Sequence, residues 1–500
     1  MLLYNKKGLI IMIMLQKENK MGNTLSDLEP KKVFEFFYDL TQIPRSSGNE
    51  KAVSDYLVDF ADKRGLIAYQ DELNNVTMIK PATSGMEDKD NVILQAHIDM
   101  VAVRDEGVSI DPASDPLDVY VDGNYVKARG TSLGADDGIG VALILALLDS
   151  NDISHPMLEA VFTADEEVGL GGANGYDCSH IKGTRLINLD NEVENEIVNG
   201  CAGGCRCDMT NKCKNGKEEG NIYEIGISGL AGGHSGVEIH KGSANANVLM
   251  GRFLDLAMQN VEINLSTYEG GTKDNAICSA ASALVVVKKK HSKTFEKLVK
   301  LFCEDVLAEY GKTDPDFIIK CKDKGKGKLE VISSKDLNRF VSLLNLIPNG
   351  VAKYSQRYDM VETSSNIGVV TVKPKSFSIT TSLRSNIDAS LDYMISKLSK
   401  LATAYGVQLN VRGRYPAWES RDDSEFSKAA AATYKRMFGK DIRVTPIHAG
   451  LECAVFSKKI KGMDAISIGP DLPDVHTTNE KLSIASTKRM WDYLLELVRL

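Results

Sequence analysis

The sequence predicts an α/β protein in which a mostly parallel mixed sheet lies between helices and an α+β domain is inserted. Over the first two hundred residues, helical patterns alternate with short apolar runs, which is typical of such a sheet. From about Cys201 the chain changes to longer strand-like segments around Gly-rich loops, and after residue 417 the alternation returns. A chain of 500 residues is also too long for one simple core.

The first part of the chain supplies both kinds of element in turn. Apolar residues at helical spacing predict helices at 34–43 and 50–65, and a strongly apolar helix at 136–150. Short runs rich in β-branched and aliphatic residues predict strands at 75–82, 91–103, 158–166 and 185–192. Similar helix and strand patterns reappear near the C-terminus, at 426–439, 441–459, 464–470 and 486–500.

The inserted segment repeats one order of elements. A predicted helix at 295–311 ends in Tyr-Gly and precedes a strand at 316–323. A second helix at 391–406 also ends in Tyr-Gly and precedes a strand at 407–413. We therefore expect the insertion to consist of two related α+β halves.

Composition and charge restrict the function. With 43% hydrophobic residues the chain has enough apolar material for real cores, and its net charge of −8 argues against nucleic acid or an anionic membrane as partner. Nine cysteines without a disulfide spacing favour a reducing, cytoplasmic location. The lysine-rich segment 320–328 contains two glycines and is interpreted as a solvated turn.

The N-terminus carries an apolar run at 9–15, which is too short to span a bilayer. No small-residue cleavage site follows it, so it does not match a signal peptide. Because a good helix start follows Met21, we predict that residues 1–20 are an N-terminal extension.

Acidic and histidine residues gather where predicted strands end or a helix begins. Five segments carry them: His97 and Asp99; Asp136 and Asp137; Glu166 and Glu167; Asp190; and His476. Because ligands bind beyond the carboxyl ends of strands in open α/β sheets, these side chains are expected at one edge. Singly, each has a structural explanation: a strand-end histidine can be a hydrogen-bonded structural residue, and Asp137 can cap the helix. Jointly, they point to a site.

Two imidazoles with three carboxylates suit a pair of divalent metal ions. Zinc accepts histidine nitrogen and carboxylate oxygen, and in two-metal hydrolytic sites the ions lie close enough to share a ligand. Asp99 lies two residues after His97, so both side chains share a strand face and the carboxylate can orient the imidazole. The adjacent Glu166 and Glu167 are expected to have different partners, since strand neighbours face opposite ways.

Seven ordered motifs closely resemble the aminoacylase/carboxypeptidase G2-like clan of co-catalytic metallopeptidases, and within it the bacterial aminoacyl-histidine dipeptidases. These motifs are HIDMV, GTSLGADDGIG, TADEEVGLGGA, INLDNE, GGHSGVEIHKGSANA, IHAGLEC and DVHTTNE. The resemblance extends from about Met21 to the C-terminus. It implies a catalytic domain at 21–201 and 418–500 with two active-site metals, and a lid or dimerisation-like domain at 202–417.

The resemblance also implies a role for each motif residue. Two divalent metal ions, zinc by default with manganese or cobalt as alternatives, would be bound by His97, Asp136, Glu167, Asp190 and His476, with Asp136 bridging. Glu166 would act as general base and Asp99 would orient His97. On the inserted domain, His234 would contact the reacting carbonyl, and the backbone and carboxylate of the substrate would be bound by Asn275, Arg384 and Gly450.

The activity implied is hydrolysis of dipeptides, either Xaa-His dipeptides or a broad range, by a metal-activated water with Glu166 as the base. An N-acyl amino acid amidohydrolase of the same clan is the alternative enzyme, and a non-catalytic peptide-binding relative is a further alternative. The long two-part insertion favours the dipeptidase branch over deacylases with shorter lids. Dipeptides are the expected partners, and both a monomer and a homodimer are left open.

Overall fold

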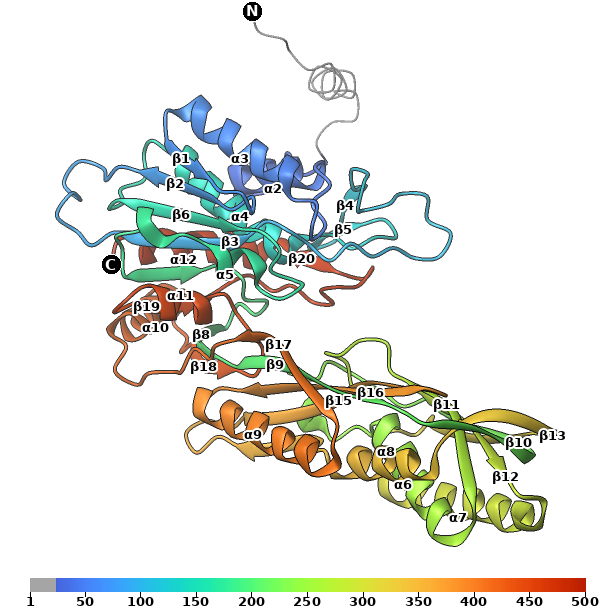
Figure 1. The fold of residues 1–500 in the computed structure, drawn as a ribbon. Coiled ribbons are helices and arrows are strands. Elements are labelled where there is room, and N and C mark those ends of the chain that lie inside the picture. The colour runs from blue at the N-terminus through green and yellow to red at the C-terminus, as the bar shows by residue number, and fades with distance from the viewer. Residues whose placement is uncertain (1–23) are drawn as a thin grey trace, which may run out of the picture. The chain divides into compact units, whose positions relative to one another are not determined.

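The structure is a computed structural model that describes residues 24–500 and divides them into two compact units (Figure 1). Unit 1 comprises residues 24–199, 421–445 and 451–500, and unit 2 comprises 200–420 and 446–450. The predicted extension at residues 1–20 lies outside the described residues. The chain therefore builds unit 2 as an insertion into unit 1 and returns to unit 2 once more for five residues. Assignment of a catalytic role to one unit and a lid role to the other stays a prediction.

Unit 1 contains an eight-stranded mixed sheet. In chain order its strands are β1 (Ile67–Gln70), β2 (Val76–Lys80), β3 (Val92–His97), β6 (Leu158–Thr163), β7 (Arg185–Asn188), β8 (Glu196–Cys201), β18 (Arg443–Ile447) and β19 (Asp464–Ser467). In space their order is β1-β2-β6-β3-β7-β19-β8-β18. The central strands β6, β3, β7 and β19 are parallel, whereas β2 and β8 pair with them in the antiparallel direction. The predicted α/β class with a mixed sheet is confirmed.

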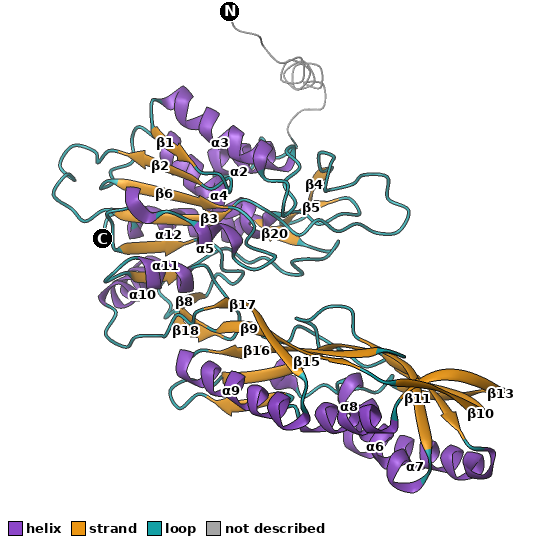
Figure 2. Ribbon diagram, in the orientation of Figure 1, coloured by secondary structure: helices purple, strands orange, loops and turns teal. Residues whose placement is uncertain are grey.

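Helices surround this sheet and bury its apolar side chains (Figure 2). They are α2 (Lys31–Thr41), α3 (Lys51–Arg64), α4 (Ala135–Asp149), the short α5 (Gly171–Gly175), α10 (Glu425–Phe438), α11 (Cys453–Lys459) and α12 (Ile484–Leu497). Every residue of α4 from Ala135 to Leu148 is buried, because α4 packs against both α2 and β3. A helix that is apolar on all sides needs such a position. The first turn of α4, which carries Asp136, is thereby fixed in the core of unit 1.

A small second sheet completes unit 1. It consists of β4 (Val119–Asp122), β5 (Tyr125–Ala128) and β20 (Lys481–Ser483), in the order β20-β5-β4. The strand β20 follows the segment of His476 directly, and Leu482 in β20 is fully buried. This pairing therefore attaches the C-terminal segment of the candidate site to the rest of unit 1.

Unit 2 is built on a nine-stranded antiparallel sheet with helices on it. Its strands are β9 (Gly203–Lys212), β10 (Asn215–Ser228), β11 (Ile263–Gly270), β12 (Ala281–Val287), β13 (Ile318–Ile332), β14 (Gly350–Tyr354), β15 (Val361–Lys373), β16 (Ser376–Ser385) and β17 (Gln408–Tyr415). Its helices are α6 (Ala246–Asn260), α7 (Ser292–Tyr310), α8 (Ser334–Leu346) and α9 (Asp388–Tyr405). One continuous apolar core lies between the helices and the sheet.

The sheet order of unit 2 supports the expectation of two related halves. The order is β13-β10-β12-β11-β15-β16-β9-β17, with β14 paired to β15. The strand that follows α7, β13, forms one edge, and the strand that follows α9, β17, forms the other. Each half thus ends in a helix followed by an edge strand, as the repeated helix, Tyr-Gly and strand pattern predicts.

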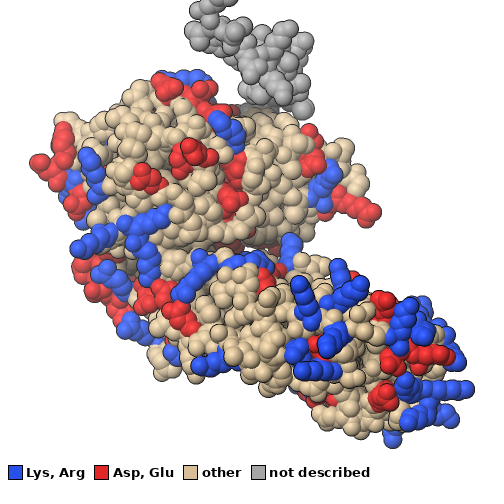
Figure 3. Space-filling view, viewed as in Figure 1, with Lys and Arg blue, Asp and Glu red and all other residues tan. Residues whose placement is uncertain are grey.

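The interpretation of residues 320–328 as a turn is wrong. They lie inside β13, which pairs with β10 over almost its whole length. The lysines at 320, 322, 324, 326 and 328 are exposed, and two of them form ion pairs with Glu224 and Glu219 of β10. Figure 3 shows the resulting mixture of basic and acidic side chains at the end of unit 2 that carries β10 and β13. Lysine side chains along an edge strand disfavour pairing with another chain, which explains why this strand is rich in lysine.

None of the helices within residues 24–500 combines the length and the apolar composition that a membrane span requires. The cysteines of the described part are all free thiols.

Candidate active site

Asp136, in the first turn of α4, lies between the imidazoles of His97 and His476. Its Oδ1 is 3.0 Å from Nε2 of His97, and its Oδ2 is 3.0 Å from Nε2 of His476. Asp136 is 8% exposed and His97 is 1% exposed, so this contact lies inside unit 1. A carboxylate with one imidazole on each oxygen is arranged as a group that two cations can share.

Two more carboxylates divide between the two imidazoles. Oε1 of Glu167 is 2.9 Å from Nε2 of His476, and Oδ1 of Asp190 is 3.7 Å from Nε2 of His97. Ligand atoms of His97, Asp136 and Glu167 all lie within 4.8 Å of one another. The structure thus brings all five predicted ligands together in one cluster. Their assignment as metal ligands stays a prediction.

The charges of this cluster fit a divalent cation. Burial, followed by the charge of Asp136, raises the pKa of Glu167, and burial raises the pKa of Asp190 to about 6. Burial and the neighbouring acids also raise the pKa of Glu192 to about 8. Burial alone would lower the pKa of His476, but its hydrogen bonds with Asp136 and Glu167 outweigh burial and raise the pKa to about 11. Buried carboxylates that outnumber the imidazoles form a nitrogen and oxygen donor set that suits zinc.

Asp99 connects the histidine strand to the Glu166-Glu167 turn. Its Oδ1 lies 3.4 Å from Nδ1 of His97 and accepts the backbone N–H of Glu166 at 2.9 Å. Its Oδ2 accepts the backbone N–H of Glu167 at 3.2 Å and the hydroxyl of Ser47 at 2.7 Å. The predicted position of Asp99 beside His97 is therefore observed. Its hydrogen bonds with the backbone of both glutamates could not be predicted from the sequence.

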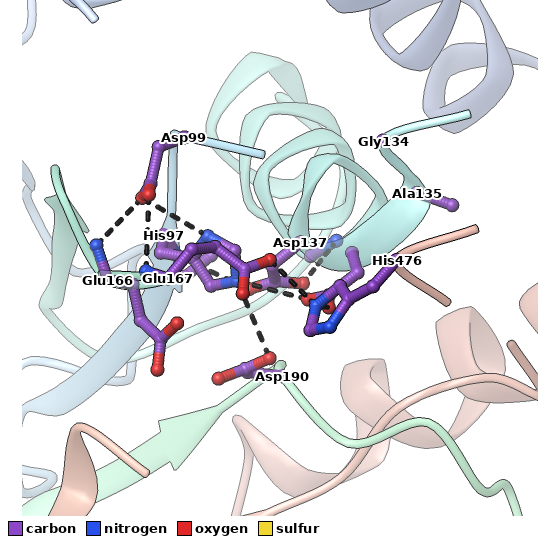
Figure 4. Close-up of polar contacts among 12 residues, drawn as sticks. His97, Asp99, Gly134, Ala135, Asp137, Glu166, Glu167, Asp190 and His476 are labelled. Atoms are coloured by element: carbon purple, nitrogen blue, oxygen red, sulfur yellow. Dashed lines mark hydrogen bonds and ion pairs between the residues drawn. The ribbon is translucent and has the colours of Figure 1, made fainter. Parts of the chain in front are cut away.

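The two neighbouring glutamates leave their turn in different directions. Figure 4 shows the side chain of Glu167 directed toward His476, whereas that of Glu166 points away from this imidazole. Burial, followed by the charges of Glu167 and Asp190, raises the pKa of Glu166 well above its usual range. The expectation that the two acids have separate partners agrees with this arrangement.

Asp137 has the capping role that its position predicts. Its Oδ1 accepts the backbone N–H of Gly140 at 3.2 Å, which caps the first turn of α4. Its Oδ2 accepts the backbone N–H of His97 at 3.3 Å. Asp137 therefore joins the start of α4 to the end of β3, the two elements that carry Asp136 and His97.

In unit 2 the predicted residues His234 and Arg384 lie together. Nη2 of Arg384 is 3.4 Å from Nε2 of His234, and Nη1 donates to Oη of Tyr415 at 3.3 Å. Arg384 is 6% exposed, and its buried Nε has no hydrogen-bond partner among the described residues. A buried guanidinium with an unused donor and no carboxylate within bonding distance is suited to bind an anion.

The other two predicted residues of unit 2 adjoin this pair. The backbone carbonyl of Asn275 accepts the N–H of Ser235, next to His234, at 2.8 Å. Gly450 lies against the ring of Tyr415, so closely that a Cβ at this position would be 2.9 Å from Cε2 of the ring. The four predicted residues of unit 2 therefore lie in one region of that unit, around Tyr415 and the His234 loop.

Several residues of these clusters were not predicted from the sequence. Tyr415 joins Arg384 to Gly450, and Glu452 accepts hydrogen bonds from Gln95 and Thr163, each at 2.5 Å. Burial raises the pKa of Glu452 to about 8. Glu452 lies inside the motif IHAGLEC, but the sequence alone does not show which residues its carboxylate contacts.

His448 is another such residue. It accepts or donates hydrogen bonds at both ring nitrogens, to Ser364 at 2.7 Å and to Asn386 at 3.1 Å. Burial, followed by the nearby charges of Arg384 and His234, lowers the pKa of His448 to about 3. A neutral imidazole thus fixes the segment 446–450, which carries Gly450, within unit 2.

Two histidines and several carboxylates at one edge of the sheet of an α/β fold are the set of side chains that a metallohydrolase uses. The profile of Peptidase family M20/M25/M40 matches residues 93–500, which is more than half of the chain. The chain therefore belongs to this family, and the predictions of a peptidase and of a hydrolase are confirmed. The resemblance drawn from the seven motifs is confirmed as well.

The chain is similar to individual members along nearly its whole length. It is 37% identical over 480 residues to the cytosol non-specific dipeptidase of Escherichia coli (strain K12), covering 95% of this chain and 98% of that protein. The crystal structure of aminoacylhistidine dipeptidase from Vibrio alginolyticus has a TM-score of 0.81 and 36% identity, covering 96% of this chain and 98% of that one. A tripeptidase from Staphylococcus aureus, at 15% identity and TM-score 0.56 over 94% and 98% of the two chains, shares the fold.

Proposed function

We propose that this protein is a cytoplasmic, metal-dependent dipeptidase that hydrolyses Xaa-His dipeptides or a broader set of dipeptides. The observation that carries the proposal is the position of Asp136, with His97 on one carboxylate oxygen and His476 on the other. The similarity to two dipeptidases over at least 95% of the chain supports the same substrate class. The name of the Escherichia coli relative supports the cytoplasmic location.

The metal-binding roles follow from the two sides of Asp136. His97 and Asp190 would hold one divalent ion, Glu167 and His476 would hold the other, and Asp136 would contribute one oxygen to each. Bound metal ions, zinc by default with manganese or cobalt as alternatives, supply Lewis acidity for the scissile carbonyl and for water.

Glu166 is the proposed general base. Its side chain points in a different direction from that of Glu167. Its raised pKa suits a group that accepts a proton and later returns it. In this role Glu166 takes the proton of the attacking water and delivers it to the leaving amine. Asp99 keeps both His97 and the backbone of Glu166 in place through the contacts described above.

Unit 2 supplies the proposed substrate-binding groups. Arg384 binds the free carboxylate of the dipeptide, because its buried fork has an unused Nε donor. His234 donates a hydrogen bond to the oxyanion that develops on the scissile carbonyl. Asn275 and Gly450 bind the peptide backbone. A carboxylate-binding arginine would measure the length of the substrate from that end, which restricts the enzyme to short peptides.

The test is a substrate panel on metal-loaded, full-length protein. The panel contains carnosine, several dipeptides with and without C-terminal histidine, tripeptides and N-acetyl amino acids, with metal content measured on the same sample. We expect hydrolysis of dipeptides and loss of activity after treatment with a chelator. Activity confined to the N-acetyl amino acids would replace the proposal with the deacylase alternative, and absence of all turnover with metal bound would favour a peptide-binding relative.

A further inference from the structure

Glu480 accepts four consecutive backbone N–H groups of the loop that leads into α4. The donors are Leu133 at 2.8 Å and Gly134 at 3.0 Å to one oxygen, and Ala135 at 2.7 Å and Asp136 at 3.3 Å to the other. Glu480 is 3% exposed, so this carboxylate is buried beneath the loop. Hydrogen bonds to a charged acceptor are stronger than neutral ones, and four of them fix the path of the backbone into Asp136.

Arg45 contacts the same loop at the carbonyl group of Gly134. Its guanidinium donates to the carbonyl oxygens of Ile98 at 2.9 Å and Asp99 at 2.8 Å, and also to that of Gly134. Arg45 is 2% exposed. It therefore joins the segment after His97 to the loop before Asp136 from inside the core.

Gly134 is the residue at which the two contacts meet, since its N–H points to Glu480 and its carbonyl to Arg45. Its φ of 65° lies in the left-handed region that favours glycine. A Cβ there would be 2.6 Å from Sδ of Met100 and 2.8 Å from Nη2 of Arg45. The backbone at Gly134 is thus fixed by hydrogen bonds with Glu480 and Arg45, and the site has no space for a side chain.

We propose that Arg45 and Glu480 are positioning residues that together hold Asp136 in the arrangement required for metal binding. We call the pair the Arg45–Glu480 clamp. Neither residue is among the five proposed ligands, so the clamp acts through the backbone of residues 133–136 and, through Arg45, of residues 98–99. The inference rests on the proposed function in so far as Asp136 is a shared metal ligand.

The clamp also connects Asp136 with His476. Glu480 lies four residues after His476 in the same segment, and this segment is closed by hydrogen bonds from Lys481 to Pro473 and from Glu480 to Thr477 at 3.2 and 3.3 Å. One short segment thus supplies an imidazole of the cluster and the anion that fixes the facing carboxylate. Loss of the clamp is therefore expected to loosen Asp136 relative to both histidines.

The alternative is that the pair only stabilises unit 1, as many buried charges do. Glu159 provides a matched control, because it is 1% exposed and accepts the backbone N–H groups of Lys182 at 3.0 Å and Gly183 at 2.9 Å. It lies near the start of β6, whereas the candidate site lies beyond the strand ends. Loss of Glu159 removes a buried carboxylate with backbone partners and leaves the loop of residues 133–136 intact.

The test compares Glu480→Gln with Glu159→Gln in full-length protein stripped of metal. Zinc affinity is measured by calorimetric titration, and stability by thermal unfolding of the metal-free protein. Because loss of groups that orient metal ligands typically costs about 10- to 100-fold in affinity, we expect Glu480→Gln to weaken zinc binding at least ~10-fold. Glu159→Gln is expected to leave zinc affinity at the wild-type value, because the carboxylate of Glu159 bonds to Asn91, Lys182 and Gly183.

A second variant keeps the test decisive if Glu480→Gln does not fold. Arg45→Lys retains the positive charge but cannot reach three carbonyls in a planar fork, and it is expected to weaken zinc binding and to speed amide exchange at residues 133–136. Unchanged zinc affinity in the variants, or an equal loss in Glu159→Gln, would overturn the clamp alone. Wild-type protein that binds zinc but hydrolyses no dipeptide would overturn the proposed function alone.

Discussion

Oδ1 of Asp99 accepts the backbone N–H of Glu166 at 2.9 Å. The same oxygen lies 3.4 Å from Nδ1 of His97, so one buried atom orients the imidazole on one side and the proposed base on the other. An acid in this place is expected to affect the candidate metal cluster and the proposed base together.

Asp99→Asn is expected to lower kcat/KM by about 10- to 100-fold, because the amide keeps the shape but loses the charge and one acceptor. Steady-state kinetics with a dipeptide and zinc titration measure the effect. Ser47→Ala is the control, since it removes only the hydroxyl that donates to Oδ2 of Asp99 at 2.7 Å. Equal losses in the two variants would contradict a specific role for Asp99.

Glu166→Gln is expected to reduce kcat by about 10²- to 10⁴-fold, the usual contribution of a general base, while metal content stays at the wild-type level. The backbone contact of Glu166 with Asp99 does not involve the substituted side chain, so the turn should be preserved. Glu167→Gln provides the contrast and should lose metal. Elemental analysis of both variants, together with kcat, distinguishes a base from a ligand, and a Glu166→Gln protein with full turnover would rule out the base assignment.

Tyr415→Phe removes the oxygen that accepts Nη1 of Arg384 at 3.3 Å. Because one hydrogen bond to a charged group is worth about 1.5–3 kcal/mol, KM for dipeptides should rise by about 10-fold or more with little change in kcat. A dipeptide with a C-terminal amide should show a smaller effect, since it offers no carboxylate to Arg384. Tyr223→Phe, which loses a contact with Glu296 elsewhere in unit 2, is the control. The same loss on acid and amide substrates would argue against carboxylate recognition.

Gly450→Ala is expected to raise KM by a similar factor of about 10 through the same tyrosine. The new methyl group would lie 2.9 Å from Cε2 and 3.2 Å from Oη of Tyr415, so the ring must shift and its hydrogen bond with Arg384 is disturbed. Gly216→Ala places a methyl group where no atom lies within 4 Å and should leave KM unchanged. If Gly450→Ala has wild-type kinetics, the close packing of the ring is not important for binding.

His448 predicts a pH dependence of unit 2. Its pKa is about 3 in the folded protein, against about 6.5 in an unfolded chain, so the unfolded state binds more protons as the pH falls below 6.5. The contribution of His448 to the free energy of unfolding is complete above pH 6.5 and is lost progressively toward pH 3. At pH 5 the loss is about 2 kcal/mol. Hydrogen exchange in the peptide covering β15, which contains Ser364, measures the loss at pH 7.5 and 5. His448→Gln should reduce the difference between the two pH values, whereas a change at the exposed His240 should not.

The residues of the candidate metal cluster lie together, as the sequence predicts, because one geometric rule determines their positions. Where parallel strands end, their following residues must meet, and this places His97 and Asp190 near each other in the structure. The first turn of α4 then brings Asp136 to the same edge. Local patterns suffice for such residues because strand direction is the same for all of them.

The same reasoning does not extend to partners that share no local pattern. Glu480 and Gly134 are separated by 346 positions, and nothing in the composition around either one shows that a carboxylate meets a row of N–H groups. Tyr415 is unremarkable at the end of an edge strand until the fold places it beside Arg384. In the lysine-rich segment 320–328, glycine favours a turn locally, but pairing with β10 determines the conformation and makes the segment a strand.

The two ends of the insertion are joined to each other. The N–H of Cys201 donates to the carbonyl of Trp418 at 2.8 Å, and the N–H of Trp418 donates back to Cys201 at 3.1 Å. Once unit 2 has folded, the paired ends of the insertion keep residues 199 and 421 close together. Little chain entropy is then lost when the two flanking segments of unit 1 come together. Residues 446–450 are made later during synthesis, and without His448 the groups of Ser364 and Asn386 lack their shared partner. In a nascent chain that ends before residue 446, the two ends of the insertion can therefore pair, but unit 2 still lacks the contacts of His448.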